Sequence, residues 1–154
     1  MNDSGSYILF RLGEGSYAVR TSNVEHIEML EHVTPVPNAA PAVDGVVFSR
    51  GKVVPAISLR ARFGMARQPH TAGTRLIFVR AHDRLVALIV DSAREFQRIS
   101  ADLVRPGEAS LTGIEGNYVE GTATVSGKNV LIIDVGAVLT LEEATVPEQA
   151  GSAS

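Results

Sequence analysis

Two stretches of the chain combine a glycine with a Gly-Lys dipeptide, residue types that cradle phosphate groups in nucleotide-binding loops. The first is Gly45–Lys52 and the second is Gly121–Lys128. In both, five residues separate the glycines where the phosphate loop has four, and Val53 and Asn129 stand where a magnesium-binding Ser or Thr is required. We therefore interpret both stretches as tips of β-hairpins that carry an edge-protecting lysine.

The other reactive side chains do not form a catalytic or metal-binding pattern. The segment Gly13–Tyr17 has its serine in the wrong position for the Gly-x-Ser-x-Gly turn of serine hydrolases. The chain has no cysteine, and its histidines lack the i,i+4 spacing of helical zinc ligands, so we expect no metal and no cofactor. The four histidines are His26, His32, His70 and His82.

Two aspartates, Asp91 and Asp134, each follow an apolar strand pattern. Such residues form either a carboxylate pair or the caps of the next turn or helix. Asp134 directly precedes the expected last helix, which favours capping. Since no catalytic constellation remains, the sequence predicts a protein that is not an enzyme.

Composition excludes several further classes of protein. The chain has 154 residues, 45% of them hydrophobic and 20% charged, which is enough apolar material for a packed core. The net charge of −3 and the absence of tryptophan disfavour nucleic-acid binding. No apolar run approaches the about 20 residues of a membrane helix, and the N-terminus lacks a signal-peptide pattern. We expect a cytoplasmic protein without membrane insertion that is a monomer or weak dimer on its own.

The pattern along the chain is mostly strand. Valine and isoleucine dominate the expected strands, as is typical of buried sheet positions. Helical periodicity appears only after residue 135, with one further turn expected at 60–65, and 24–30 fits either a strand or a short helix. The four expected hairpins span residues 7–19, 45–59, 75–90 and 119–135.

The chain also contains an internal repeat. Residues 43–59 align without gaps on residues 119–135, with six identities in 17 positions, whereas average composition gives roughly one. The first hairpin overlays the third at an offset of 68 residues, which places Phe10 on Phe78. Hairpin, connector and hairpin thus occur twice, with a longer second connector around residues 107–116.

This repeat predicts a mainly β fold of two similar subdomains, at about residues 15–70 and 75–135, that share one core. Strands this short close most readily as small barrels, which leave no exposed edge. The ordered domain is expected to span residues 7–145. Residues 1–6 and 146–154 are small and polar and are expected to be flexible.

Arg50 stands out within the repeat. Its counterpart is Ser126, so the hairpin turn does not require arginine. A planar guanidinium at a hairpin tip suits a carboxylate on a partner or on the other subdomain. The equally weighted alternative is a solvated turn residue.

Several linked segments form a recognisable pattern. Its longest motif, Gly-Val-x-Asn-Leu-Arg-Gly-x-Val-x-Pro-x-x-Asp-Leu-Arg, corresponds to Gly45–Arg60. The others are Tyr7–Leu12, Tyr17–Val19, Val24–Ile27, Thr34–Pro41, Leu85–Asp91, Arg105–Pro106, Tyr118–Gly121 and Leu131–Asp134. With these segments the chain resembles the CheW-like family, the adaptors of bacterial chemosensory arrays, over about residues 6–142.

The resemblance implies two five-stranded SH3-like β-barrels that share a core and exchange end strands, with a short C-terminal helix. It implies a non-catalytic scaffold that couples chemoreceptors to a CheA-like histidine kinase at membrane-associated receptor arrays. The expected partners are the regulatory domain of the kinase and the helical tip of the receptor. The partner-binding residues that it implies, around a groove between the barrels, are Arg50, Val24, His26, Ile27, Ile89 and Val90.

The chain departs from the family pattern at several positions. His26 replaces a glutamate, which predicts a pH-sensitive contact and a preference for a less basic partner surface. Further departures are Phe48-Ser49 for Asn-Leu, Ser58 for Asp and Ala87 for Gly. A divergent member is therefore expected, for flagellar chemotaxis, pilus motility or another non-flagellar chemosensory system. The remaining alternative is a small-molecule-sensing module with its ligand between the subdomains.

Overall fold

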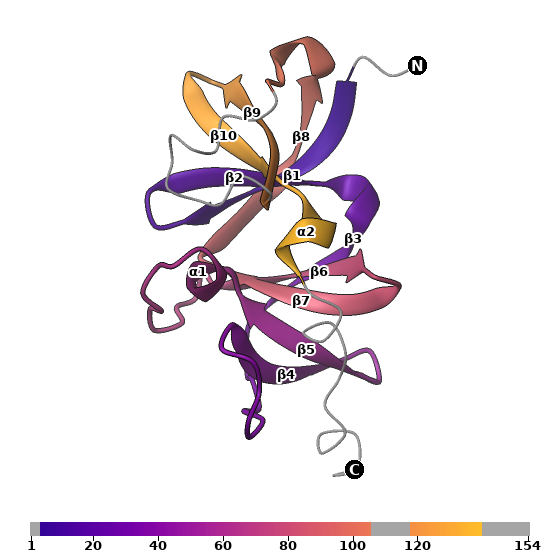
Figure 1. Ribbon diagram of the computed structural model, residues 1–154, viewed down its shortest axis with the longest axis vertical. Coiled ribbons are helices and arrows are strands. Elements are labelled where there is room, and N and C mark those ends of the chain that lie inside the picture. The colour runs from indigo at the N-terminus through magenta and orange to yellow at the C-terminus, as the bar shows by residue number, and fades with distance from the viewer. Residues whose placement is uncertain (1–3, 106–117, 140–154) are drawn as a thin grey trace.

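Ten strands in two five-stranded sheets make up most of the part of the chain that the computed structural model describes, residues 4–105 and 118–139. The four hairpins expected from the sequence are all present (Figure 1). The strands are β1 (Ser4–Leu12), β2 (Gly15–Arg20), β3 (Val24–Met29), β4 (Val43–Ser49), β5 (Lys52–Ser58), β6 (Arg75–Ala81), β7 (Arg84–Val90), β8 (Ser92–Ser100), β9 (Val119–Val125) and β10 (Lys128–Ile133).

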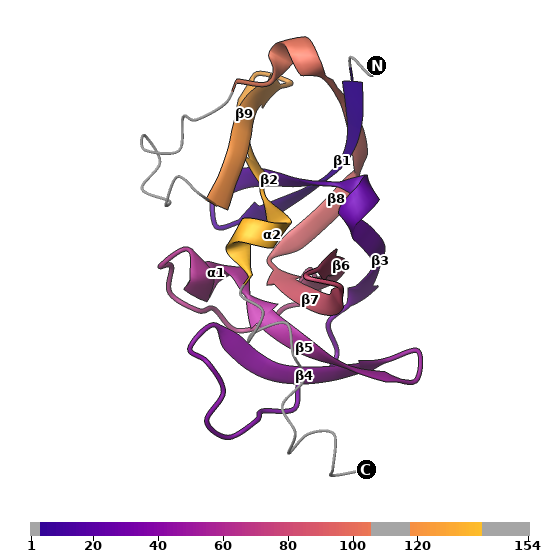
Figure 2. The same ribbon diagram turned by 45° about the vertical axis from the view of Figure 1, so that its right-hand side comes forward.

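Each sheet curls into a small barrel, which confirms the predicted fold class. Barrel one has the strand order β8-β1-β2-β10-β9, and barrel two has the order β3-β6-β7-β5-β4. Within each, two hairpins are joined by one parallel pair, β2 with β10 and β5 with β7. Isolated backbone bridges, Arg105 with Thr122 and Thr34 with Val46, hold a connector against the edge of β9 and of β4. Figure 2 shows the two barrels one above the other.

The barrels do not coincide with contiguous halves of the chain. The first hairpin, β1–β2, joins β8, β9 and β10, whereas β6–β7 joins β3, β4 and β5. The subdomain boundaries expected at 15–70 and 75–135 therefore do not match the two sheets. In each repeat, the first hairpin belongs to one barrel and the remaining three strands belong to the other. The two repeats thus exchange whole hairpins and not only their end strands.

The structure corrects the alignment of the two first hairpins by one residue. β1 ends at Leu12 and β2 begins at Gly15, whereas β6 ends at Ala81 and β7 begins at Arg84, so the offset is 69. Phe10 therefore corresponds to Val79, and both lie in the core between the barrels. Phe78 faces the interior of barrel two instead. Because side chains alternate along a strand, a one-residue slip exchanges the two faces.

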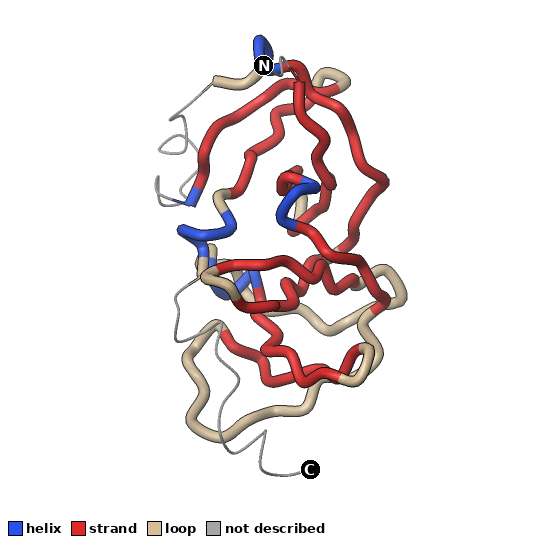
Figure 3. The backbone as a smooth tube through the Cα atoms, turned by 90° about the vertical axis from the view of Figure 1, so that its right-hand side faces the viewer, coloured by secondary structure: helices blue, strands red, loops and turns tan. Residues whose placement is uncertain are grey.

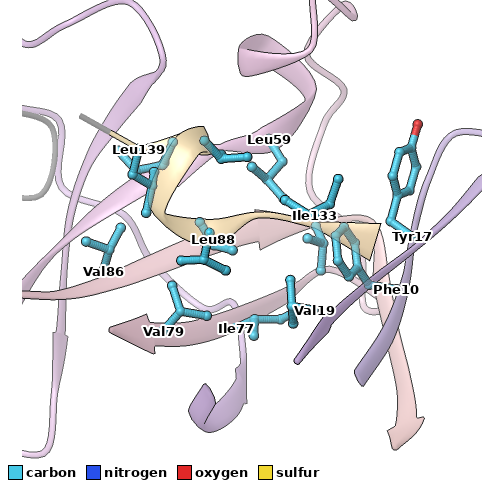
Figure 4. Close-up of a cluster of buried hydrophobic side chains, with 14 of the residues drawn as sticks. Phe10, Tyr17, Val19, Leu59, Ile77, Val79, Val86, Leu88, Ile133 and Leu139 are labelled. Atoms are coloured by element: carbon cyan, nitrogen blue, oxygen red, sulfur yellow. The ribbon is translucent and has the colours of Figure 1, made fainter. Parts of the chain in front are cut away.

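A single large core lies between the barrels, as the repeat predicts. Figure 4 shows side chains of β1, β2, β6, β7 and β10 converging there, and the exposed fractions of Phe10, Leu88 and Ile133 do not exceed 1%. Each barrel also has a smaller interior cluster, around Phe78 in barrel two and around Ile132 in barrel one. The shared core joins the barrels because neither small sheet alone buries enough apolar surface.

The helices are short turns at the ends of strands (Figure 3). α1 (Leu59–Arg62) is capped by Ser58, whose hydroxyl accepts from the Ala61 amide, and α2 (Val135–Val138) is capped by Asp134, which accepts from the Ala137 amide. These two caps occupy equivalent positions of the repeat, and the capping role predicted for Asp134 is confirmed. Two 3₁₀ turns lie at Thr21–Asn23 and Ala101–Leu103.

Other differences from the expected elements have local causes. β8 has no counterpart among the expected strands, because its sequence Ser-Ala-Arg-Glu-Phe-Gln-Arg-Ile-Ser lacks an apolar alternation. The ambiguous segment 24–30 is the strand β3. β1 begins at Ser4, so the ordered domain starts before the expected residue 7. The expected second connector around 107–116 and the tail 146–154 lie outside the described residues. Within the described ranges no helix has the length and apolar character to cross a membrane.

Asp91 ties three elements together rather than forming a pair with another carboxylate. Arg60 of α1 donates to Asp91 at 2.8 and 2.5 Å in a bidentate arrangement, and the Gly13 amide of the β1–β2 turn donates to it at 2.7 Å. The hydrogen bonds from Arg60 lower the pKa of the Asp91 carboxyl, partial burial opposes this, and the Gly13 amide lowers it further. Asp91 therefore links barrel two to the first turn of barrel one.

We expect Asp91→Asn to lower the free energy of unfolding at pH 7 by about 2 kcal/mol, the usual contribution of hydrogen bonds to a charged group. Because the folded-state pKa is depressed, the stabilisation is complete above the ordinary aspartate pKa and is lost as pH falls through the folded-state value. Urea denaturation at pH 7 and at successively lower pH checks this. A gap between wild type and variant that widens on acidification would contradict it.

Candidate functional site

Arg50 lies at the exposed tip of the β4–β5 hairpin. It has φ +52° and Gly51 has φ +79°, which are the left-handed conformations of a two-residue hairpin turn. Ser126 and Gly127 in the β9–β10 turn have the same φ values, +52° and +79°. The backbone of this turn thus accepts serine as well as arginine, and the turn geometry does not explain the guanidinium.

A hydrogen-bonded group of side chains lies next to this turn, where the edge strands β3 and β4 of barrel two approach each other. The Ser49 hydroxyl donates to Oε2 of Glu28, and Nε2 of His26 lies 2.8 Å from the same oxygen. The imidazole of His26 stacks on the Phe78 ring, with centroids 4.2 Å apart and planes 13° apart. We call His26, Glu28, Ser49 and Arg50 the Arg50 cluster.

Glu28 is the charged centre of the Arg50 cluster. The hydrogen bond from Ser49 holds the pKa of the Glu28 carboxyl below its usual range, and partial burial works in the opposite direction. The hydrogen bond from His26, the electrostatic influence of its ring and the positive charge of Arg50 lower the pKa further. The carboxylate is therefore ionised at neutral pH, one-third exposed, and held in place between two strands.

Glu28 and Ser49 were not among the residues expected at the site. The available signal was the strand period of two, which puts His26 and Glu28 on the same face of β3. A carboxylate thus stands two residues beyond the position where His26 replaces the family's glutamate. This removes the ground for expecting a less basic partner surface, because the local negative charge is still present.

His26 is more buried than a rim contact would be. Its side chain is 11% exposed, and its Nδ1 is buried with no hydrogen-bond partner among the described residues. The ring closes the side of barrel two over Phe78 and positions Glu28. The structure thus places His26 and Arg50 around one carboxylate, that of Glu28.

Val24 and Ile27 lie on the opposite face of β3. Both are half-buried and pack against the core between the barrels, opposite Val79 and Ile77 of β6. They form an apolar surface adjoining the Arg50 cluster but separated from it by the thickness of the strand. Part of each side chain remains exposed.

The expected apolar wall made by Ile89 and Val90 is not present on the surface. Ile89 is 7% exposed and packs inside barrel two, and Val90 is 1% exposed and belongs to the shared core. Both lie on β7, the middle strand of its sheet, which is covered on both faces. A continuous apolar run is typical of a strand buried on both faces, which explains why these two residues do not lie on the surface.

The described residues contain no group of three or more His, Asp or Glu side chains that is suited to a metal ion. The Ser49 hydroxyl donates its hydrogen bond to the Glu28 carboxylate, and the His26 ring stacks on Phe78. Neither side chain is therefore arranged as part of a nucleophile–base pair. The arrangement is suited to protein recognition, because a cation and a fixed carboxylate stand beside a half-exposed apolar strand.

Comparison with known proteins places these features in context. Residues 6–143 match the family model of the CheW-like domain. The chain is 30% identical over 145 residues to the chemotaxis protein CheW of Bacillus subtilis (strain 168), covering 93% of each, and 27% identical over 142 residues to that of Rhizobium meliloti (strain 1021), covering 92% of each. The crystal structure of the scaffolding protein TtCheW from Thermoanaerobacter tengcongensis has a TM-score of 0.82 at 25% identity, covering 92% of this chain and 97% of that one.

Proposed function

This chain belongs to the CheW-like domain family, and from that premise we propose that it is a non-catalytic scaffold that couples chemoreceptors to a CheA-like histidine kinase. The family match spans residues 6–143, so it includes both barrels and the whole Arg50 cluster. We further propose that the chain acts in the cytoplasm and joins receptor arrays at the membrane through these partners.

The observation that carries the proposal is the unexplained arginine of an otherwise repeated turn. Arg50 and Ser126 share one backbone conformation, yet only Arg50 stands beside an ionised carboxylate. The Arg50 guanidinium is exposed within electrostatic range of Glu28, where a partner carboxylate can accept hydrogen bonds from a pair of its N–H groups.

The apolar component of the proposed surface is β3. Val24 and Ile27 are half-buried, so a partner helix laid along this strand gains from covering their remaining surface. Such a helix suits the tip of a receptor helical hairpin. Ile89 and Val90 are buried and do not contact the partner directly.

Reconstitution with the receptor cytoplasmic fragment and the kinase of the same organism tests the proposal. We expect the three proteins to co-sediment, and we expect the receptor to alter the rate of kinase autophosphorylation only when this chain is present. A chain that binds neither protein, or that leaves the kinase rate independent of the receptor, would exclude the coupling function.

A further inference from the structure

Barrel one has an open groove at the place where barrel two carries the Arg50 cluster. The groove has a volume of about 670 Å³ and is lined by β1, β2, β8 and the tip of the β9–β10 hairpin, all in the upper barrel of Figure 2. We call it the barrel-one groove. Its lining includes Leu9, Phe96, Gln97, Val125, Ser126 and Lys128.

The strand registers show that the groove and the Arg50 cluster are equivalent positions of the repeat. Gln97 pairs with Tyr7 of β1 as Glu28 pairs with Leu76 of β6. On the other edge, Val125 pairs with Lys128 as Ser49 pairs with Lys52. The two mouths therefore share one backbone frame and differ in their side chains.

The side chains explain why one mouth is closed and the other open. In barrel two the Ser49 hydroxyl and the Glu28 carboxylate bridge the gap between the edge strands. Val125 has no hydroxyl to offer Gln97, so no such bridge forms in barrel one. The groove is the space that remains.

The lining of the groove combines apolar surface with positive charge. Phe96 is 59% exposed, and the partly buried Leu9 and Val125 add apolar surface. Arg11 and Lys128 line the groove and supply positive charge to it. The structure shows no ion pair of Lys128 with any described residue, whereas Arg11 lies within the electrostatic range of Asp91.

We propose that the barrel-one groove binds an extended segment of a partner protein that alternates acidic and large apolar residues. The apolar side chains cover Phe96, and the carboxylates meet Lys128 and Arg11 at the rim. The strand β8 ends its sheet, so its outer backbone groups are available to an added strand, whereas the outer edge of β9 already pairs with Arg105 at Thr122. This site is separate from the Arg50 cluster, and its test does not depend on the receptor–kinase proposal.

Titration of the ¹⁵N-labelled full chain with two synthetic peptides of equal length tests this assignment. One alternates glutamate with phenylalanine and leucine, and the other has lysine in place of each glutamate. We expect the acidic peptide to shift the amide resonances of Phe96, Gln97 and Lys128, and the basic peptide to bind at least about tenfold more weakly. Since this comparison uses the wild-type protein, it does not depend on the folding of any variant.

The variants Lys128→Glu and Phe96→Ser should each weaken the acidic peptide several-fold. Lys52→Glu, at the equivalent turn of barrel two, is the matched control and should leave the affinity unchanged. Equal binding of both peptides, resonance shifts centred on Arg50 and His26, or displacement of the peptide by an equimolar small carboxylate such as hexanoate would each overturn the proposal.

Discussion

Replacing Gly45 with alanine is expected to lower the melting temperature by roughly 10–20 °C or to prevent folding. A Cβ atom at this position would lie 2.1 Å from the Thr34 carbonyl oxygen and 2.9 Å from Cα of Pro35, both of them backbone atoms. Gly45 also has φ +147°, a conformation that is almost confined to glycine.

The clash at Gly45 breaks a contact on which the closure of barrel two depends. The backbone N–H and C=O of Thr34 and Val46 form two hydrogen bonds, both 2.8 Å, beside this glycine. Losing them costs about 0.5–1.5 kcal/mol each, and the strained backbone adds about 1–3 kcal/mol. Against a typical total stability of about 5–15 kcal/mol, this loss is large.

Two other glycines serve as controls for Gly45→Ala. Gly51→Ala should cost only about 1–2 kcal/mol, because φ is +79° but no atom lies within 4 Å of the added Cβ. Gly121→Ala, the repeat counterpart, should be milder than Gly45→Ala, since the nearest atom, at 2.8 Å, is Cγ1 of the Val104 side chain. Thermal denaturation of the three variants checks the order. A Gly45→Ala variant as stable as Gly51→Ala would contradict it.

Arg50→Glu is expected to abolish coupling while leaving the melting temperature nearly unchanged. The exposed tip contributes little to packing, whereas inverting its charge beside Glu28 both removes a donor and places two carboxylates together. Disrupting a hydrogen-bonded charge pair in an interface costs about 2–5 kcal/mol, which corresponds to a loss of affinity of about 25-fold or more.

The repeat provides a matched control for Arg50→Glu. Ser126→Glu introduces the same residue at a turn of the same backbone conformation in barrel one, and it should leave kinase coupling intact. Binding of the receptor fragment and of the kinase is measured by titration calorimetry, and folding by thermal denaturation. If both variants bind like the wild type, Arg50 is a solvated turn residue; if Arg50→Glu unfolds, the arginine is structural.

Local signals in the sequence accounted for the four hairpins, the two equivalent Gly-containing turns and the cap at Asp134. These features depend on residues within a few positions of one another, so short-range sequence patterns are enough to predict them. The same comparison within the sequence distinguished Arg50 from Ser126. The internal repeat predicted two small barrels that share a core, and family resemblance supplied the five-stranded SH3-like type of barrel and the function that it implies.

The tertiary structure decided which hairpin joins which barrel, and with it the composition of the site. The parallel pairs β2–β10 and β5–β7 connect residues far apart in the chain, and no local preference specifies them. For the same reason Glu28 meets Ser49 only after barrel two has closed, and Ile89 becomes buried only because β7 lies inside its sheet. Local sequence determines the four hairpins and their turns, whereas β8, burial and side-chain contacts depend on pairing between distant strands, which requires packing of the whole chain.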